Sequence, residues 1–141
     1  MPVKKMGFEG EIYYGTAGGT AATKITNSQD ITITYDIEEG PTTVRGSGSS
    51  PPINTSRVTA LSFSVEWTML LKSDDTTLEN LRVAAAAGNP VAIRLKDYSS
   101  GKGYDGDCIL NVNHGVPLKG EQTVRFTGKP NDDNRTPQLY V

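Results

Sequence analysis

The feature that most constrains this chain is residues 58–71, VTALSFSVEWTMLL, where large apolar residues alternate with small or polar ones. Because alternate side chains lie on opposite faces of a β-strand, this stretch predicts a strand with one face in a core. At about 3.3 Å per residue it would be roughly 46 Å long, well beyond an average strand. Such a strand curves or projects beyond its own domain, unless it is the central strand of an ordinary sandwich. The residues predicted to face the core are Leu61, Phe63, Val65, Trp67, Met69 and Leu71.

The composition predicts a single, mainly β domain. A chain of 141 residues can build one core, and its 15 Gly and 8 Pro favour strands joined by generous turns. The net charge is −2, with acidic and basic residues interspersed, which argues against a surface built to grip nucleic-acid phosphates. Cys108 is the single cysteine, so we expect it to pack in the core without an internal disulfide.

Other segments are predicted as strands because apolar and polar residues alternate along them. One helix is predicted over residues 76–87, with Asp74, Asp75 or Thr76 as its cap and Gly88 at its end. The predicted strands are residues 8–14, which are short and mixed, and residues 30–37, 90–96, 107–113 and 121–127.

No residue pattern indicates catalysis or metal binding. Cys108 and His114 cannot by themselves form a zinc ligand set, and Asp-Gly-Asp at 105–107 matches only part of a calcium loop, so a turn is predicted there. His114 could act as a general base, but its position at a strand end favours a turn residue. The sequence also lacks an apolar run typical of a signal peptide or a transmembrane helix. We therefore expect no enzyme activity, no cofactor, no membrane anchoring and synthesis in the cytosol.

The order of the elements, together with residues 106–130, GDCILNVNHGVPLKGEQTVRFTGKP, resembles bacteriophage tail tube proteins. The shared sequence pattern is, in order along the chain, a strand that ends near a polar turn, then a Pro or small residue, then Gly, and then a strand in which Thr, Val and Phe alternate. The resemblance covers residues 30–128 and extends to the type VI secretion tube protein, which shares the architecture. It implies one tail-tube-like domain over residues 1–141: a β-sandwich or half-barrel with one flanking α-helix.

The resemblance also implies a function. In that family six copies form a ring, and the rings stack into a tube whose inner wall is a continuous β-barrel for DNA passage. It implies a virion tail protein that is made and assembled in the host cytoplasm and meets sheath, baseplate, tape-measure and tail terminator proteins. The alternatives are a type VI-like secretion tube, a virion decoration protein, and a carbohydrate-binding β-sandwich in which Trp67 or tyrosines stack on a sugar.

Polar faces of two predicted strands are the candidates for the wall of the channel. If their apolar faces pack in the core, the opposite faces are free to line a lumen. These faces carry no Lys or Arg, as suits a conduit that should not retain DNA phosphates. The candidate lumen residues are Thr32, Thr34, Asp36, Ser62, Ser64, Glu66 and Thr68.

Residues 38–56, rich in Gly and Pro, are predicted to be a long connection with a short pairing near residues 42–45. A loop of this length in a compact domain needs an external reason, so we interpret it as an arm that reaches the next ring or a neighbouring subunit; the alternative is a solvated flexible loop. The candidate inter-ring residues are Arg45, Gly46, Ser47, Gly48, Pro51 and Pro52.

Apolar residues in the two terminal segments are predicted to lie at contacts between subunits. The segments are residues 2–14 and residues 137–141, the latter being the end of an extended tail over residues 129–141. Both are otherwise polar and broken, and lone termini seldom keep apolar residues without a docking surface. The alternative is that both ends fold back on their own domain. The candidate interface residues are Phe8, Tyr13, Tyr14, Leu139 and Tyr140.

Overall fold

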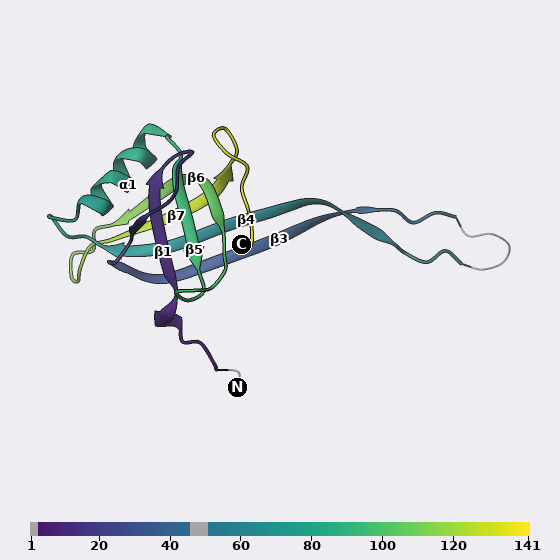
Figure 1. The fold of residues 1–141 in the computed structure, drawn as a ribbon, viewed down its shortest axis with the longest axis horizontal. Coiled ribbons are helices and arrows are strands. Elements are labelled where there is room, and N and C mark those ends of the chain that lie inside the picture. Colours follow the sequence, from purple (N-terminus) through teal and green to yellow (C-terminus); the bar gives the residue numbers. More distant parts are fainter. Residues whose placement is uncertain (1–2, 46–50) are drawn as a thin grey trace.

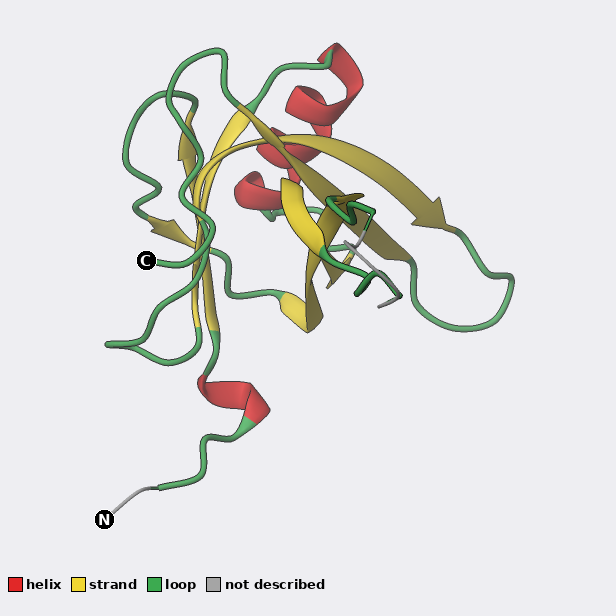
Figure 2. Cartoon of the chain, turned by 90° about the vertical axis from the view of Figure 1, so that its right-hand side faces the viewer, coloured by secondary structure: helices red, strands yellow, loops and turns green. Residues whose placement is uncertain are grey.

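One curled antiparallel sheet builds the domain in the computed structural model, which describes residues 3–45 and 51–141 (Figure 1). Within these residues the sheet has seven strands in the order β2-β1-β5-β6-β7-β4-β3. The strands curl into a half-barrel, and the helix covers one side of it (Figure 2). The elements are η1 (Gly7–Glu9), β1 (Glu11–Thr16), β2 (Thr23–Lys24), β3 (Ser28–Pro41), β4 (Ser56–Leu70), α1 (Thr76–Ala87), β5 (Val91–Lys96), β6 (Asp105–Gly115) and β7 (Thr123–Asn131).

The long alternating stretch forms β4, the longest strand, as predicted. It pairs with β3 along almost its whole length, from Ser28 opposite Met69 to Pro41 opposite Ser56. Pairing with β7 ends at Val65 opposite Gly128, so the other half of β4 has only β3 as a neighbour. The two strands therefore project from the half-barrel as a long hairpin (Figure 1).

The predicted boundary of the connection was wrong at its first residues. Residues 38–41 belong to β3, because Glu38, Glu39 and Gly40 keep pairing with β4 across a bulge at Thr59. Glycine suits position 40 of the strand because a Cβ there would lie only 2.9 Å from the Thr59 side chain, closer than van der Waals contact allows. Only residues 42–55 connect the strands, and Thr42 N donates to Thr55 O across the base of this connection.

The core takes only part of the apolar face that the sequence predicts for β4. Leu61 is exposed, and Leu71 is partly buried beyond the end of the strand. The reason for the exposure of Leu61 is that it lies on the projecting half of the hairpin, where no other element covers it in the described residues. The buried residues of the face are Phe63, Val65, Trp67 and Met69.

Trp67 packs in the centre of the core, where its ring stacks on Phe126 with 5.3 Å between the centroids. Burial confirms the expectation that Trp67 is a core residue. It also removes this indole as a platform for a sugar.

Helix α1 has the predicted bounds. Of the three predicted cap candidates, Asp75 serves: its Oδ1 accepts from Leu78 N at 3.1 Å. The helix ends at Gly88, which adopts a left-handed conformation with φ of 74°. Leu78 and Leu81 anchor the helix in the core.

Strands β3 and β6 extend beyond the predicted ranges at both ends, whereas β5 begins one residue later than predicted and β7 begins and ends later. Strand β1 begins at Glu11 rather than residue 8, and the short β2 was not predicted. The Asp-Gly-Asp segment is not a turn, because its residues 105–107 begin β6. After β7 the chain returns to the sheet: Gln138 pairs with Asp105, and Val141 exchanges backbone hydrogen bonds with Gly103.

Candidate functional site

The seven predicted lumen residues lie together on the sheet face that points away from the core. Their positions follow from the register, which sets Thr32 opposite Glu66, Thr34 opposite Ser64 and Asp36 opposite Ser62. Residues paired across strands share a face, and their core-side neighbours such as Val65 are buried. The structure therefore brings all seven into one polar surface, and their role as a channel wall stays a prediction.

Strands β7 and β6 extend this polar surface, which the sequence prediction missed. Thr127 and Arg125 lie opposite Glu66 and Thr68 on β4, and β6 continues the row with Asn111 opposite Thr127. The alternation along both strands was visible in the sequence, but their place beside β4 was not. We call the surface the polar face: Thr32, Thr34, Asp36, Ser62, Ser64, Glu66, Thr68, Ile109, Asn111, Asn113, Thr123, Arg125, Thr127 and Lys129.

The polar face is charge-balanced rather than free of basic residues. Arg125 Nη2 lies 2.5 Å from Glu66 Oε2, so the carboxylate that projects from β4 is paired on the neighbouring strand. Lys129 adds a second cation and Asp36 a second anion. Because charges of both signs are interspersed, this surface has no basic stripe that would hold a phosphate backbone.

Two long strand edges lack a partner among the described residues. β3 is the last strand of the sheet, so its outer edge is open. β5 pairs with β6 only from Asp105 to Cys108, so residues 109–115 of β6 have β7 on one side and no strand on the other in the described part of the chain. Open edges of this length are available for pairing with another chain.

The projecting hairpin also exposes apolar side chains on the face that continues from the core. Ile37 pairs with Leu61, and the bulge at Thr59 returns Val58 to the same face opposite Glu39. Tyr35 lies next along the strand, opposite the buried Phe63. We call these four residues the hairpin patch; their exposed fractions are 46% for Tyr35, 59% for Ile37, 52% for Val58 and 62% for Leu61.

The predicted inter-ring residues lie at the end of this hairpin. Arg45, Pro51 and Pro52 are exposed, whereas Gly46, Ser47 and Gly48 lie outside the described residues. The arm thus has its base, at the pairing of Thr42 with Thr55, far from the core (Figure 1). Its contact with another ring or subunit stays a prediction.

The terminal residues predicted for an interface divide into two groups. Phe8 and Tyr140 are exposed and available for another chain. Tyr14 and Leu139 pack against the core of their own domain, and Tyr13 sits in β1 beside the Lys96 ammonium, 5.4 Å from its ring centroid. For the carboxy-terminal end, this geometry favours the alternative in which the terminus folds back.

An ion pair between the buried Asp107 and the partly exposed Arg135 holds the carboxy-terminal segment to the sheet. Asp107 is fully buried; its carboxylate accepts from Gly18 N at 3.0 Å and from Arg135 Nε at 3.2 Å. Arg135 also contacts Asp105 at 3.2 Å. Further along, Arg94 donates to the backbone oxygen of Val141 at 2.8 Å. These contacts were not foreseen from the sequence.

Nothing in the described residues has the geometry of a reactive centre. Cys108 is buried as predicted, and burial raises the pKa of its thiol to about 12, so it stays protonated at neutral pH. His114 hydrogen-bonds Gln122 at 2.9 Å. The described part of the chain holds no group of three or more His, Cys, Asp or Glu placed to bind a metal. None of its helices is long and apolar enough to cross a membrane.

Solved structures of a tail tube and of gene transfer agent particles share this fold. A chain in the tail of an empty gene transfer agent particle with C6 symmetry superposes with a TM-score of 0.76 at 14% identity, covering 98% of this chain and 100% of that one. A chain in the virion of a native gene transfer agent gives 0.72 at 13% identity, over 98% and 100% of the two chains. The SPP1 tail tube gives 0.68 at 10% identity, over 97% of this chain and 78% of that one.

These similarities confirm the predicted fold class, a half-barrel with one flanking helix. The chain has the fold seen in the SPP1 tail tube and in the tail of a gene transfer agent. No protein-family model matches the sequence, and no curated protein matches it.

Proposed function

We propose that this protein is the structural subunit of a phage-like tail tube, without catalytic activity. Six copies form a ring, the rings stack, and the tube conducts DNA from the virion. The observation that carries the proposal is the fold itself, with two open strand edges flanking one continuous polar face. The SPP1 structure is a tail tube, and the gene transfer agent tail has C6 symmetry, which supports six copies here.

The direction of the strands supports closure into a barrel. Strands β6, β7, β4 and β3 alternate in direction, because each neighbouring pair is antiparallel. Rotation about the axis of a ring preserves direction, so β3 of one copy runs antiparallel to β6 of the next. Pairing of these two edges would join four strands from each copy into one antiparallel wall and remove both open edges.

The polar face is the inner wall in this proposal. The opposite face of the same strands packs against the core and α1, so the polar face is the surface these strands leave free to line a channel. Its paired Glu66 and Arg125 and its interspersed charges suit passage of DNA, since few phosphate contacts would retard it. Assembly in the host cytoplasm and end contacts with sheath, baseplate, tape-measure and terminator proteins belong to the same proposal.

Electron microscopy of the purified protein tests the assembly. We expect rings or tubes with six-fold symmetry in negative stain, and a high-mass species in size exclusion. A uniform 15.1 kDa species at high protein concentration would refute the tube. The type VI alternative shares the fold, but the similar structures belong to gene transfer agent and phage particles, which favours a virion tail.

Selective labelling tests which face lines the channel. In assembled tubes, a Thr34→Cys variant should resist a maleimide polymer too large to enter the lumen, and it should react after disassembly. Ala87→Cys at the exposed end of α1 is the control and should react in both states. The native Cys108 thiol is buried, so background labelling by the maleimide should be low. Rapid labelling of Thr34→Cys in intact tubes would place the polar face outside.

A further inference from the structure

The geometry points to a specific contact between neighbouring copies: the hairpin patch of one subunit docks into the groove between α1 and β6 of the next. This inference rests on the proposed ring. It starts from two apolar surfaces that the described part of a single chain leaves uncovered, the hairpin patch and Val112 in the floor of this groove.

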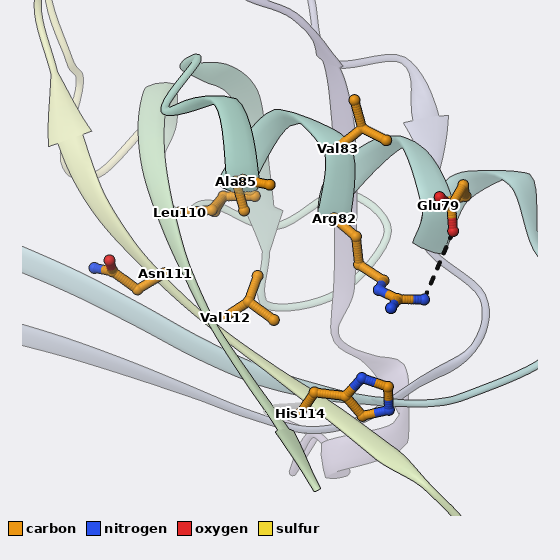
Figure 3. A pocket seen from close by; sticks show the side chains of 9 residues that line it. Glu79, Arg82, Val83, Ala85, Leu110, Asn111, Val112 and His114 are labelled. Atoms are coloured by element: carbon orange, nitrogen blue, oxygen red, sulfur yellow. Dashed lines mark ion pairs between the residues drawn. The ribbon is translucent and has the colours of Figure 1, made fainter. Parts of the chain in front are cut away.

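The groove has a volume of about 520 Å³ and an apolar floor (Figure 3). Leu110 and Val112 of β6 form the floor and Ala85 and Arg82 of α1 the roof, while Asn111 points away toward the polar face (Figure 3). Val112 lies opposite the fully buried Phe126 on the core side of the sheet, yet 40% of its surface is exposed. The apolar core therefore reaches the surface here at Val112, which the other described residues cover only in part.

The hairpin patch continues the same core-side face at the other border of the sheet. Ile37 and Leu61 pair with each other two positions beyond Tyr35 and Phe63. Both borders coincide with the open edges, β3 for the patch and residues 109–115 of β6 for the groove. The hairpin patch and the groove thus lie at opposite borders of one sheet face, and the edges beside them, β3 and β6, are antiparallel between copies related by rotation. A second copy of this chain therefore fits both surfaces.

Edge pairing alone would bring the two surfaces together. When β3 lies along β6 of the next copy, the sheet continues and the core-side face of the hairpin comes to lie beside Leu110 and Val112 of that copy. The helix α1 of the same copy then covers the hairpin patch. Each subunit would complete its neighbour's core, and apolar surface on both sides would leave water.

Serine substitutions on opposite faces of β6 test the docking. Val112→Ser removes a groove residue, and Ile109→Ser is its matched control on the same strand, with exposed fractions of 40% and 38%. Both isolated subunits should keep their melting temperature, because both residues are surface-exposed. Val112→Ser, and likewise Ile37→Ser on the hairpin, should raise the protein concentration needed for rings by about tenfold or more, whereas Ile109→Ser should leave it near the wild-type value.

Cross-linking locates the contact. An Ile37→Cys, Val112→Cys double variant should form covalent ladders of up to six chains with a short bis-maleimide in assembled rings, and only monomers when dissociated; each single variant should give no ladder. Normal rings from both serine variants, or equal weakening by Ile109→Ser, would overturn the docking while leaving the tube proposal intact. In that case the groove would be open to another virion protein. Wild-type protein that never forms rings would overturn the tube and the docking together.

Discussion

At the scale of single residues, the charge that matters most for the subunit is the buried carboxylate of Asp107. It accepts hydrogen bonds from Gly18 N and Arg135 Nε, and this arrangement joins three distant parts of the chain. Gly18 can present its amide because its φ is 81°, in the left-handed region that favours glycine. The contact therefore fixes the loop after β1 and the segment after β7 to β6.

Removing this carboxylate should destabilise the domain strongly. Asp107→Ala leaves the Arg135 guanidinium without its buried partner, and we expect the free energy of unfolding to fall by about 3 kcal/mol or more. The measurement is urea unfolding of the isolated subunit. Asp105→Asn is the control: Asp105 contacts the same arginine, but it is partly exposed, so about 1 kcal/mol or less is expected. Equal losses in the two variants would contradict a special role for Asp107.

The buried thiol of Cys108 makes the stability of the fold depend on alkaline pH. Burial raises its pKa from 9.0 to about 12, so between these values the unfolded chain loses the proton and the folded chain keeps it. The thiol's contribution is therefore complete below pH 9 and is lost as the pH rises toward 12, with a slope of up to about 1.4 kcal/mol per pH unit. Burial also raises the pKa of the Tyr104 phenol, which acts in the same direction.

Unfolding of wild type and Cys108→Ala across pH 8–11 measures this effect. The variant should lose less stability above pH 9, although its cavity lowers the starting value. As an independent readout, a thiol reagent at pH 8 should react with Cys108 only as fast as the folded protein unfolds enough to expose this thiol. Reaction at the rate of a free thiol would show that Cys108 is accessible.

At the scale of elements, the β3–β4 hairpin is the part of the subunit that its own core cannot explain. Its inner half carries buried Phe63 and Val65, whereas its outer half exposes the hairpin patch. Beyond Tyr35, which donates to the backbone oxygen of Leu139, the outer half is held by pairing between its two strands. Side-chain contacts near the far end, such as Thr42 with Thr55 at 2.7 Å, are polar and exposed. The outer half therefore adds little to the stability of the isolated domain.

Shortening the connection should separate folding from assembly. Deletion of residues 46–52 leaves every described core residue in place, and the flanking Val44 and Ile53 are exposed, so the isolated subunit should keep its melting temperature within a few degrees. Polymerisation into tubes should be lost if the arm reaches the next ring or a neighbouring subunit. The readouts are thermal unfolding and negative-stain microscopy. Normal tubes from the deletion would contradict the role of the arm.

At the scale of the whole molecule, the carboxy-terminal segment belongs to the subunit as well as to any interface. Leu139 packs on the core and accepts a hydrogen bond from Tyr35 through its backbone oxygen, while Val141 is held by Gly103 and Arg94. Tyr140 remains exposed. An interface role for this tail therefore falls on Tyr140 more than on Leu139.

Truncation of residues 137–141 should lower the stability of the isolated subunit. The loss of apolar contact from Leu139 and of the pairing with Gly103 should cost about 2–4 kcal/mol, measured by urea unfolding. Tyr140→Ala is the matched control, because it removes only an exposed side chain and should leave unfolding unchanged. An unchanged melting temperature in the truncation would show that the tail serves assembly alone.

The sequence by itself determined the local elements. The period of two along β4, β5, β6 and β7 and the cap and stop of α1 depend on neighbours a few residues apart, so they could be read from residues such as Asp75 and Gly88. The same patterns also identified which side chains of β3 and β4 face away from the core.

Only the tertiary structure decided how these elements meet. Gly40 and Pro41 favoured a loop locally, yet cross-strand pairing on an edge strand kept them in β3. Three further features depend on strand register and on partners far along the chain. They are the contact of Arg125 with Glu66, the open edge of β6, and the burial of Asp107, whose carboxylate accepts from the distant Gly18 amide. Local propensity carries no information on such distant pairings, because which segments pair depends on the free energy of the complete fold and not on the preferences of the paired residues alone.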